Sequence, residues 1–389
     1  MTKTSCFSHV LPHSKQVARK PANHGPTLLI HGGAGRIVKK KIPCEEIPDE
    51  QKEEYLQAMK EALKVGCDIL KRGGRAVDAV VAAVRVMEDC PLYNAGKGAV
   101  FTRSGKNELE SSIMIGTPSH PAGAVTLLRT IKNPVVLAKT LMLDPENSHV
   151  FLGGEGAEKY AREKGVEVVD PSYFWTEARW KEHLEGLANE GGNDKGEKRD
   201  SCYGDKSESD DANNSLPSYD DVVNKGKTEN NTKREPVGSN GDWFYMNSMG
   251  TVGAVAVDAD GVIAAATSTG GKNNKSDGRI GDSPVIGCGT WADNETCGVS
   301  GTGEGEFLIR YTLARGIASR MEYLNESVEQ AASAMIDLLS KVGTEAGVVA
   351  LDKYGNFTIQ YNTSGMFRGY IRASDEIPHA YIFPDDVDD

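Results

Sequence analysis

The sequence predicts an α/β (α+β) protein in which β-sheets pack on each other and helices lie outside them. Strand-like and helix-like runs come in blocks rather than in strict alternation, which disfavours a parallel sheet with a helix after every strand. The part of the chain after residue 250 also contains two hairpin patterns, one turning at Asp260-Gly261 and one at Tyr354-Gly355-Asn356. Hairpins of this kind indicate antiparallel sheets.

The N-terminal part begins with a polar stretch, residues 1–26, which we expect to be a flexible arm. "TLLIHGGAG" (27–35) predicts a short buried strand that runs into a glycine turn. Residues 53–70 carry apolar side chains at helical spacing, and a glycine pair ends the predicted helix. Residues 76–90 are apolar on nearly every side, which is typical of a helix buried between layers.

Shorter elements are expected in the rest of the chain. Before the midpoint the patterns predict strands near 99–102, 108–114 and 122–128, and helices near 134–142, 155–164 and 176–188. After residue 250 they predict a hairpin over 251–269, strands in "PVIGCGTWA" and "CGVSGTG", helices near 304–320 and 327–341, and a closing hairpin in "AGVVALDKYGNFTIQYNT".

Between these two parts, residues 189–242 consist of Asn, Asp, Glu, Lys, Gly and Ser with almost nothing to bury. Such a segment cannot offset its ordering entropy, so the sequence predicts a disordered linker over 189–250. The linker stops abruptly at Gly250-Thr251, where an apolar strand starts on the threonine itself. We therefore expect one catalytic domain made of two parts, 27–188 and 251–389.

Bulk composition excludes several classes of function. The net charge is −12 and the pI is about 5.3, which argues against a nucleic-acid or anionic-membrane partner. The seven cysteines show no CxxC pair, so neither a disulfide framework nor a structural zinc site is predicted. The N-terminus lacks the apolar core of a signal peptide, and no run approaches 18 apolar residues. We expect a cytoplasmic protein.

Common catalytic motifs are absent. The glycine-rich runs satisfy neither G-x-G-x-x-G nor the P-loop pattern, and no G-x-S-x-G elbow occurs. Only His31 among eight histidines sits in an apolar, glycine-rich setting, and we interpret it as a buried structural side chain.

What remains is a concentration of Thr, Ser and Gly at strand ends after residue 250, beginning with Thr251. A threonine hydroxyl needs a base to become a nucleophile, and the α-amine of a chain-terminal threonine can serve. The pKa of an α-amine is near 8, so it accepts a proton at neutral pH. Cleavage of the Gly250–Thr251 bond would expose such an amine. A strand that merely follows an insertion is the alternative.

Several motifs, which follow one another along the chain, favour the threonine nucleophile over a strand that merely follows an insertion. They are "HGGAG", "EDCPLYNAGKGAVFT", "GTVGAVAVDADG", "ATSTGG", "GRIGDSPVIGCGTWAD", "GTGEGE" and "NTSGMFRG". On these motifs the chain resembles the isoaspartyl peptidase/L-asparaginase family of N-terminal nucleophile hydrolases, from about Thr27 to Pro384 without the insertion. The resemblance implies a four-layer αββα sandwich, self-cleavage before Thr251, and an active dimer of α–β pairs. The implied activity is hydrolysis of β-aspartyl dipeptides and L-asparagine without an organic cofactor.

The resemblance also implies roles for individual residues. Thr251 matches the nucleophile, and Thr269 matches the threonine that hydrogen-bonds it. Thr302 and Gly303 match the oxyanion hole, and Asn94 matches a residue that aids the same site.

Substrate-binding groups are matched as well. Arg279 and Asp282 match the pair that holds the substrate α-carboxylate and α-ammonium. Gly303, already named for the oxyanion hole, and Gly305 match residues beside that pair. A structural sodium (or potassium) ion is implied in the "MEDCPLYNAGK" loop, held by the backbone carbonyls of Glu88, Cys90, Tyr93, Ala95 and Lys97.

The chain departs from the family pattern at Ile115, Lys272, Asp277 and Glu304, which leaves its substrate preference open. Three alternatives stay open as well. A lysosomal glycosylasparaginase is disfavoured because a signal peptide is missing and Gly250 replaces its usual Asp. A threonine aspartase that cuts proteins shares the core motifs, and an uncleaved pseudoenzyme could use residues 189–242 to bind a partner.

Overall fold

The computed structural model of this protein describes residues 24–35, 40–41, 45–46, 49–191 and 250–386. Most of the predicted arm (1–26) and of the predicted linker (189–250) lies outside the described residues, so both stay predictions. Apart from the end of α5 (Glu177–Gly191), the elements below belong to one compact unit, which Met1–Leu187 and Tyr245–Asp389 form together.

The larger sheet has eight strands within the described residues. From edge to edge they are β14 (His379–Tyr381), β13 (Gly365–Arg372), β1 (Thr27–Gly35), β7 (Val252–Val257), β8 (Ile263–Thr269), β4 (Leu109–Ile115), β5 (Ala122–Leu128) and β6 (Phe151–Gly153). Neighbours run antiparallel except β5 and β6, which are parallel. The central strands β1, β7 and β8 are buried along their whole length, because the sheet is covered on both faces.

A smaller antiparallel sheet has four strands in the part of the chain that the structure describes. Their order is β12 (Phe357–Tyr361), β11 (Ala346–Leu351), β10 (Gly298–Gly303) and β9 (Thr290–Ala292). A separate ribbon pairs β2 (Lys40–Lys41) with β3 (Glu45–Glu46).

One apolar core joins the two sheets. It includes Leu29 of β1, Val255 of β7 and Met366 of β13 from the larger sheet, and Val349 and Leu351 of β11 from the smaller one. Strand β1 contacts β11, and β7 and β8 both contact β10. The larger and smaller sheets therefore pack against each other, as the sequence predicted.

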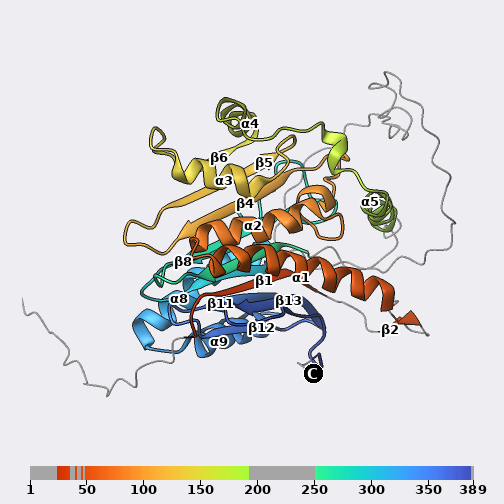
Figure 1. The fold of residues 1–389 in the computed structure, drawn as a ribbon. Helices are drawn as coiled ribbons and strands as arrows, with labels where there is room; N and C mark the ends of the chain where they lie inside the picture. The colour runs from red at the N-terminus through yellow and green to blue at the C-terminus, as the bar shows by residue number, and fades with distance from the viewer. Residues whose placement is uncertain (1–23, 36–39, 42–44, 47–48, 192–249, 387–389) are drawn as a thin grey trace, which may run out of the picture. The chain divides into compact units, whose positions relative to one another are not determined.

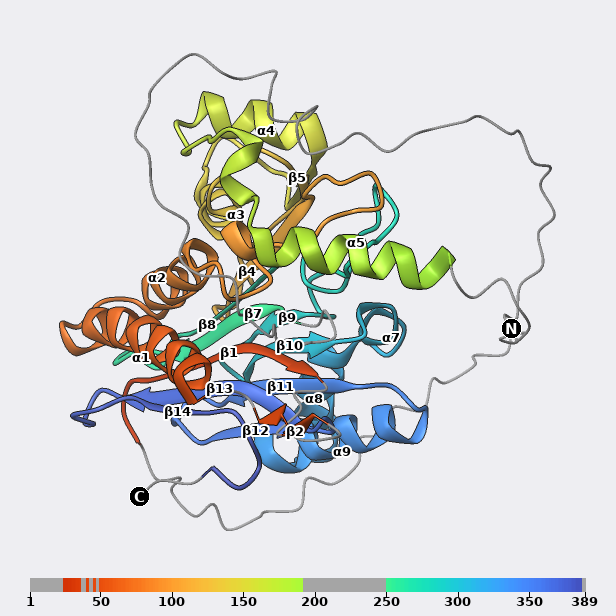
Figure 2. The same ribbon diagram turned by 90° about the vertical axis from the view of Figure 1, so that its right-hand side faces the viewer.

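Helices cover the outer faces of the sheets (Figures 1 and 2). Their bounds are α1 (Asp49–Lys71), α2 (Ala76–Asp89), α3 (Pro134–Leu143), α4 (Gly154–Glu163), α5 (Glu177–Gly191), α7 (Gly305–Arg310), α8 (Leu313–Leu324) and α9 (Val328–Lys341), with 3₁₀ turns η1 (Gly96–Gly98) and η2 (Pro171–Phe174). Helices α1 and α2 contact the larger sheet, whereas α8 and α9 contact the smaller one. The predicted α/β class is confirmed.

Local sequence explains several element ends. Helix α9 begins at a capping box, in which the Ser327 side chain accepts from the Gln330 backbone and the Gln330 side chain accepts from the Ser327 backbone. Helix α1 ends just before Gly73, whose φ of +75° favours glycine. The buried face of α2 is built from alanines and valines, which let it pack closely on β7 and β8.

Three element predictions are wrong in detail. Residues 99–102 form no strand, and only Thr102 makes an isolated bridge, to Lys275. The single helix expected over 304–320 is split into α7 and α8, because Thr312 adopts a left-handed φ of +44° between them. The patterns also did not predict β13 and β14, which extend the larger sheet beyond β1.

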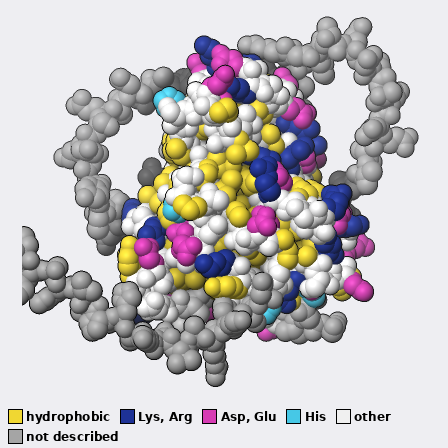
Figure 3. All heavy atoms as spheres, turned by 60° about the vertical axis from the view of Figure 1, so that its left-hand side comes forward, with side chains coloured by type: hydrophobic (Ala, Val, Ile, Leu, Met, Phe, Trp, Pro, Cys, Tyr) yellow, Lys and Arg dark blue, Asp and Glu magenta, His cyan; other side chains and the backbone are white. Residues whose placement is uncertain are grey.

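On the face drawn in Figure 3, acidic and basic side chains are interspersed with apolar ones, which is ordinary for a folded protein. No helix of the described residues is both long enough and apolar enough to cross a membrane.

Candidate functional site

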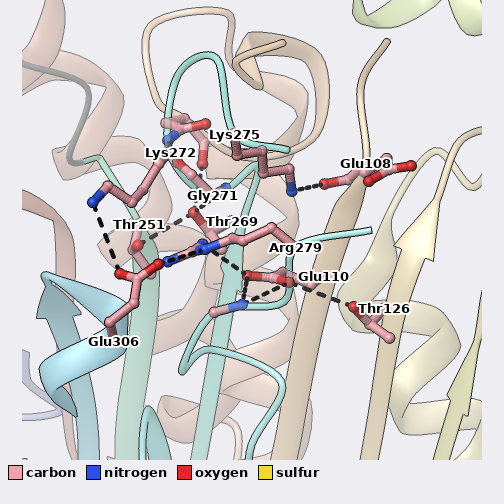
Figure 4. Close-up of polar contacts among 12 residues, drawn as sticks. Glu108, Glu110, Thr126, Thr251, Thr269, Gly271, Lys272, Lys275, Arg279 and Glu306 are labelled. Atoms are coloured by element: carbon pink, nitrogen blue, oxygen red, sulfur yellow. Dashed lines mark hydrogen bonds and ion pairs between the residues drawn. The ribbon is translucent and has the colours of Figure 1, made fainter. Parts of the chain in front are cut away.

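The threonine at the predicted cleavage point lies at the start of β7 and is nearly buried, with 8% of its surface exposed. Antiparallel pairing sets Val252 opposite Ser268, so the start of β7 lies beside the end of β8. Thr251 Oγ1 donates a hydrogen bond of 3.2 Å to Thr269 Oγ1 (Figure 4). The structure thus brings the predicted nucleophile and its predicted partner together.

Asn94 contributes to this site mainly through its backbone. Its carbonyl accepts from Thr269 Oγ1 at 3.3 Å, and its N–H donates to the carbonyl of Gly250 at 3.2 Å. The Gly250 carbonyl belongs to the peptide bond that we expect to be cut. The Asn94 side chain holds the surrounding loops in place, donating to the Gly271 carbonyl at 2.7 Å and accepting from Val100 N–H at 3.0 Å.

The predicted oxyanion hole lies at the end of β10, a strand that packs on both β7 and β8. The Thr302 side chain is fully buried, and Oγ1 has no hydrogen-bond partner within the described part of the chain. Gly303 has a φ of +141°, and a Cβ there would meet the Glu345 carbonyl. Only glycine fits, and an unpaired buried hydroxyl is a donor ready for a ligand oxygen.

Arg279 and Asp282 lie together in the loop between β8 and β9. A Cβ added at Gly305 would lie 2.7 Å from Arg279 Nη2 and 2.9 Å from Asp282 Oδ1, so these three predicted residues converge on one point. Asp282 is 5% exposed, and its Oδ2 has no hydrogen-bond partner in the described residues. Burial, reinforced by the Glu110 carboxylate, raises the pKa of Asp282 to about 7.

Two acidic residues that the sequence analysis did not identify flank Arg279. Glu306 Oε1 accepts from Arg279 Nε at 3.1 Å, and Glu110 Oε1 lies 3.9 Å from Arg279 Nη1 (Figure 4). Glu110 lies on β4 and is 1% exposed, and burial raises its pKa. The signal that could have found Glu110 is an acid in the interior of a predicted strand.

The unusual residues near Arg279 occupy two different places. Lys272 Nζ pairs with Glu304 Oε2 at 2.9 Å and lies 3.8 Å from Glu306 Oε2. Asp277 is not part of this group of charges. Its carboxylate accepts hydrogen bonds from Ser104 and Thr102 on a separate turn, and these bonds lower its pKa. Of the positions that depart from the family pattern, Lys272 and Glu304 therefore form an ion pair with each other.

The loop predicted to hold a cation follows α2 and includes η1. Gly96 and Gly98 lie directly against backbone carbonyls, since a Cβ on Gly96 would meet the Glu88 carbonyl and one on Gly98 would meet that of Tyr93. Carbonyl oxygens of this kind suit a hard monovalent cation, so the donor set fits the predicted ion. The Ala95 carbonyl, in contrast, already accepts from Gly98 N–H at 3.2 Å.

The Glu88 side chain points away from those carbonyls into the protein. Its Oε1 accepts from Ser268 Oγ at 2.6 Å and from Val135 N–H at 3.0 Å, and the residue is fully buried. Burial raises the pKa of Glu88 to about 8. The carboxyl group thus ties α2 to the residue before Thr269 and to the start of α3.

The prediction that His31 is structural agrees with its surroundings. The ring is fully buried, its Nε2 lies 2.8 Å from Ser300 Oγ, and burial lowers its pKa to about 3. Ser300 Oγ lies 2.7 Å from Thr267 Oγ1, which in turn bonds Thr290 Oγ1 at 2.6 Å. This buried hydroxyl chain crosses between the sheets next to Thr251, Thr269 and Thr302.

The chain is similar to several known proteins. A family model described as asparaginase matches residues 24–382. An isoaspartyl peptidase of Escherichia coli is 36% identical over 349 residues, covering 90% of this chain and 93% of the relative. The isoaspartyl peptidase of Salmonella typhimurium is 37% identical with 90% and 96% coverage, and the isoaspartyl peptidase/L-asparaginase of Danio rerio is 37% identical with 88% and 90% coverage.

Proposed function

This chain belongs to the asparaginase family, and from that premise we propose that it hydrolyses β-aspartyl (isoaspartyl) dipeptides and the side-chain amide of L-asparagine, releasing L-aspartate. The observation that carries the proposal is the hydrogen-bonded set at the start of β7. Thr251 Oγ1 contacts Thr269 Oγ1, and Asn94 N–H contacts the carbonyl of the peptide bond before Thr251.

Activation begins with cleavage of the Gly250–Thr251 bond. Thr251 Oγ1 attacks the Gly250 carbonyl carbon and the C–N bond breaks, which converts the amide into an ester. Water then hydrolyses the ester, leaving a carboxylate on Gly250 and a free α-amine on Thr251. The Asn94 N–H stabilises the negative charge that develops on the Gly250 oxygen.

Turnover uses the same hydroxyl with its own amine as the base. Thr251 Oγ1 attacks the substrate amide carbonyl, and the α-amine takes the hydroxyl proton and passes it to the departing nitrogen. The unpaired Thr302 hydroxyl and the Gly303 N–H stabilise the oxyanion, each worth roughly 3–4 kcal/mol. Water then cleaves the aspartyl ester and restores Thr251.

The aspartyl part of the substrate is a zwitterion, and the site offers one charge for each of its ends. Arg279 binds the α-carboxylate. Asp282 binds the α-ammonium, which supplies a partner for its unpaired Oδ2 and favours its ionised form.

The same proposal covers assembly. Cleavage yields an α chain (1–250) and a β chain (251–389), which remain joined in a four-layer αββα sandwich and form a dimer of α–β pairs. The carbonyls of the 88–97 loop would hold a sodium or potassium ion. The ion would have a structural role only, holding Asn94 and its neighbours in position.

Denaturing gel electrophoresis and an activity assay test the proposal. The purified protein should show two bands, with Thr251 as the first residue of the smaller one, and should release aspartate from a β-aspartyl dipeptide and from L-asparagine. Thr251→Ala should stay a single inactive chain. Normal processing of that variant, or an active wild type that is never cut, would refute the mechanism.

A further inference from the structure

An ion pair lies beside the groups that we assign to the reaction, and the reaction as described gives it no role. We call Lys272 and Glu304 the mouth pair. Their charged ends are 2.9 Å apart, and both side chains are partly exposed, 40% for Lys272 and 33% for Glu304. A cation in this position is within reach of a ligand that enters from solvent.

The mouth pair is attached directly to the reacting centre. Lys272 follows Gly271, whose N–H donates to Thr269 Oγ1 at 3.0 Å. Glu304 follows Gly303 of the proposed oxyanion hole. Lys272 and Glu304 therefore each follow directly, along the chain, a glycine of the proposed reacting centre.

A shared carboxylate fixes the spacing between Lys272 and Arg279. Glu306 binds Arg279 Nε through Oε1 at 3.1 Å and lies 3.8 Å from Lys272 Nζ through Oε2. Figure 4 shows both cationic side chains reaching the same carboxylate, with Thr251 beside them. Arg279 and Lys272 therefore lie on the two oxygens of one carboxylate, which sets the distance between their charges.

We infer that Lys272 binds the α-carboxylate of the leaving amino acid when the substrate is a β-aspartyl dipeptide. This inference rests on the proposed function. Such a dipeptide has two carboxylates, one on the aspartyl group and one on the leaving residue, roughly 6–8 Å apart in space when the bonds between them are extended. With the first on Arg279, the second lies within the range of the neighbouring cation.

The mouth pair also predicts a preference between the two proposed substrates. L-Asparagine releases ammonia and presents no second carboxylate, so Lys272 offers it nothing. In the free enzyme Glu304 competes for Lys272 and lowers the gain from a carboxylate ligand. Because both groups are partly solvated, we expect an effect on the order of tenfold in kcat/KM rather than a complete switch.

Lys272→Met removes the charge and keeps most of the side-chain volume, so it is the informative variant. The measured quantity is the ratio of kcat/KM for β-aspartyl-alanine to kcat/KM for its C-terminal amide, which lacks the second carboxylate. We expect this ratio to fall about tenfold in Lys272→Met, to stay within about twofold in Lys272→Arg, and to rise in Glu304→Gln. Lys353→Met is the matched control, because Lys353 pairs with Glu295 at 3.3 Å far from Thr251 in the fold.

The outcomes separate the inference from the proposed function. An unchanged ratio in processed Lys272→Met overturns the role of Lys272 even when both substrates are hydrolysed. A wild type that hydrolyses neither substrate overturns the proposed function itself. If Lys272→Met fails to fold, the wild-type enzyme still tests the inference. Wild type must then hydrolyse β-aspartyl-alanine faster than its C-terminal amide, and the reverse order refutes the inference.

Discussion

Gly305 provides a direct test of the groups proposed to bind the substrate. A Cβ at this position would lie 2.7 Å from Arg279 Nη2 and 2.9 Å from Asp282 Oδ1. Both distances are well inside normal van der Waals contact, so Gly305→Ala must displace at least one of these groups. The guanidinium ends a flexible side chain, and we expect it to move first.

The size of the effect follows from the contacts that would be lost. An arginine that binds a carboxylate through two charge-assisted hydrogen bonds contributes about 1.5–2 kcal/mol for each of them. Loss of both costs about 3–4 kcal/mol, which lowers kcat/KM by about 10²–10³-fold. Cleavage at Gly250–Thr251 uses neither Arg279 nor Asp282, so Gly305→Ala should still be processed into two chains.

The assay combines a denaturing gel with kcat/KM for a β-aspartyl dipeptide. Gly156→Ala is the matched control, because no atom lies within 4 Å of a Cβ at that exposed position in α4. A processed Gly305→Ala enzyme that keeps kcat/KM within about threefold of the wild-type value would show that Arg279 and Asp282 do not hold the substrate.

Three further predictions concern titration and packing. Asp282 must be ionised to bind an ammonium group, and its pKa is about 7, so kcat/KM should rise as the pH increases through about 7. The titration of Asp282 should not appear in the pH profile of kcat, because the bound substrate keeps the carboxylate ionised. A kcat/KM that does not depend on pH would contradict this prediction. Glu88 has a folded pKa of about 8 against 4.5 for the ordinary group, so its contribution to stability is full below about pH 4.5 and is lost as the pH rises through about 8. In urea titrations the free energy of unfolding should therefore fall by about 4–5 kcal/mol more in the wild type than in Glu88→Gln over that interval, and parallel pH profiles would count against the shift. Gly253→Ala would press a Cβ against Ser300 Oγ and His31 Nε2, and its free energy of unfolding should be about 2–3 kcal/mol lower than that of wild type; equal stability would mean that the hydroxyl chain can relax.

The sequence predicted the local elements better than their connections. Amphipathic spacing located α1, and a run that is apolar on nearly every side located α2, because a helix must bury its apolar surface wherever it lies in the fold. Periodicity did not locate β13, whose partner β1 lies more than 300 residues away along the chain, or β14, which pairs with β13. It also did not anticipate the break at Thr312, where a single residue takes a left-handed conformation.

A similar division applies to the site. Thr251, Thr269 and Arg279 were predicted because each stands inside a motif that matches the family. The backbone contacts of Asn94 leave no mark on residue identity, and the approach of Glu110 to Arg279 depends on β4 lying beside β8. Sequence therefore predicts which side chains matter, whereas the fold decides which buried groups set their charge and orientation.

The geometry of the uncut chain separates the two reactions that one hydroxyl must perform. Asn94 N–H already contacts the Gly250 carbonyl, whereas the Thr302 hydroxyl has no partner among the described residues. If the same donor served both reactions, the new Gly250 carboxylate would compete with every substrate carbonyl for it. Separate donors avoid this competition, because the Gly250 carboxylate can stay on the Asn94 N–H while the Thr302 hydroxyl remains free for a substrate carbonyl. The antiparallel pairing of β7 with β8 makes this possible, since it keeps Thr251 against Thr269 whichever carbonyl is attacked.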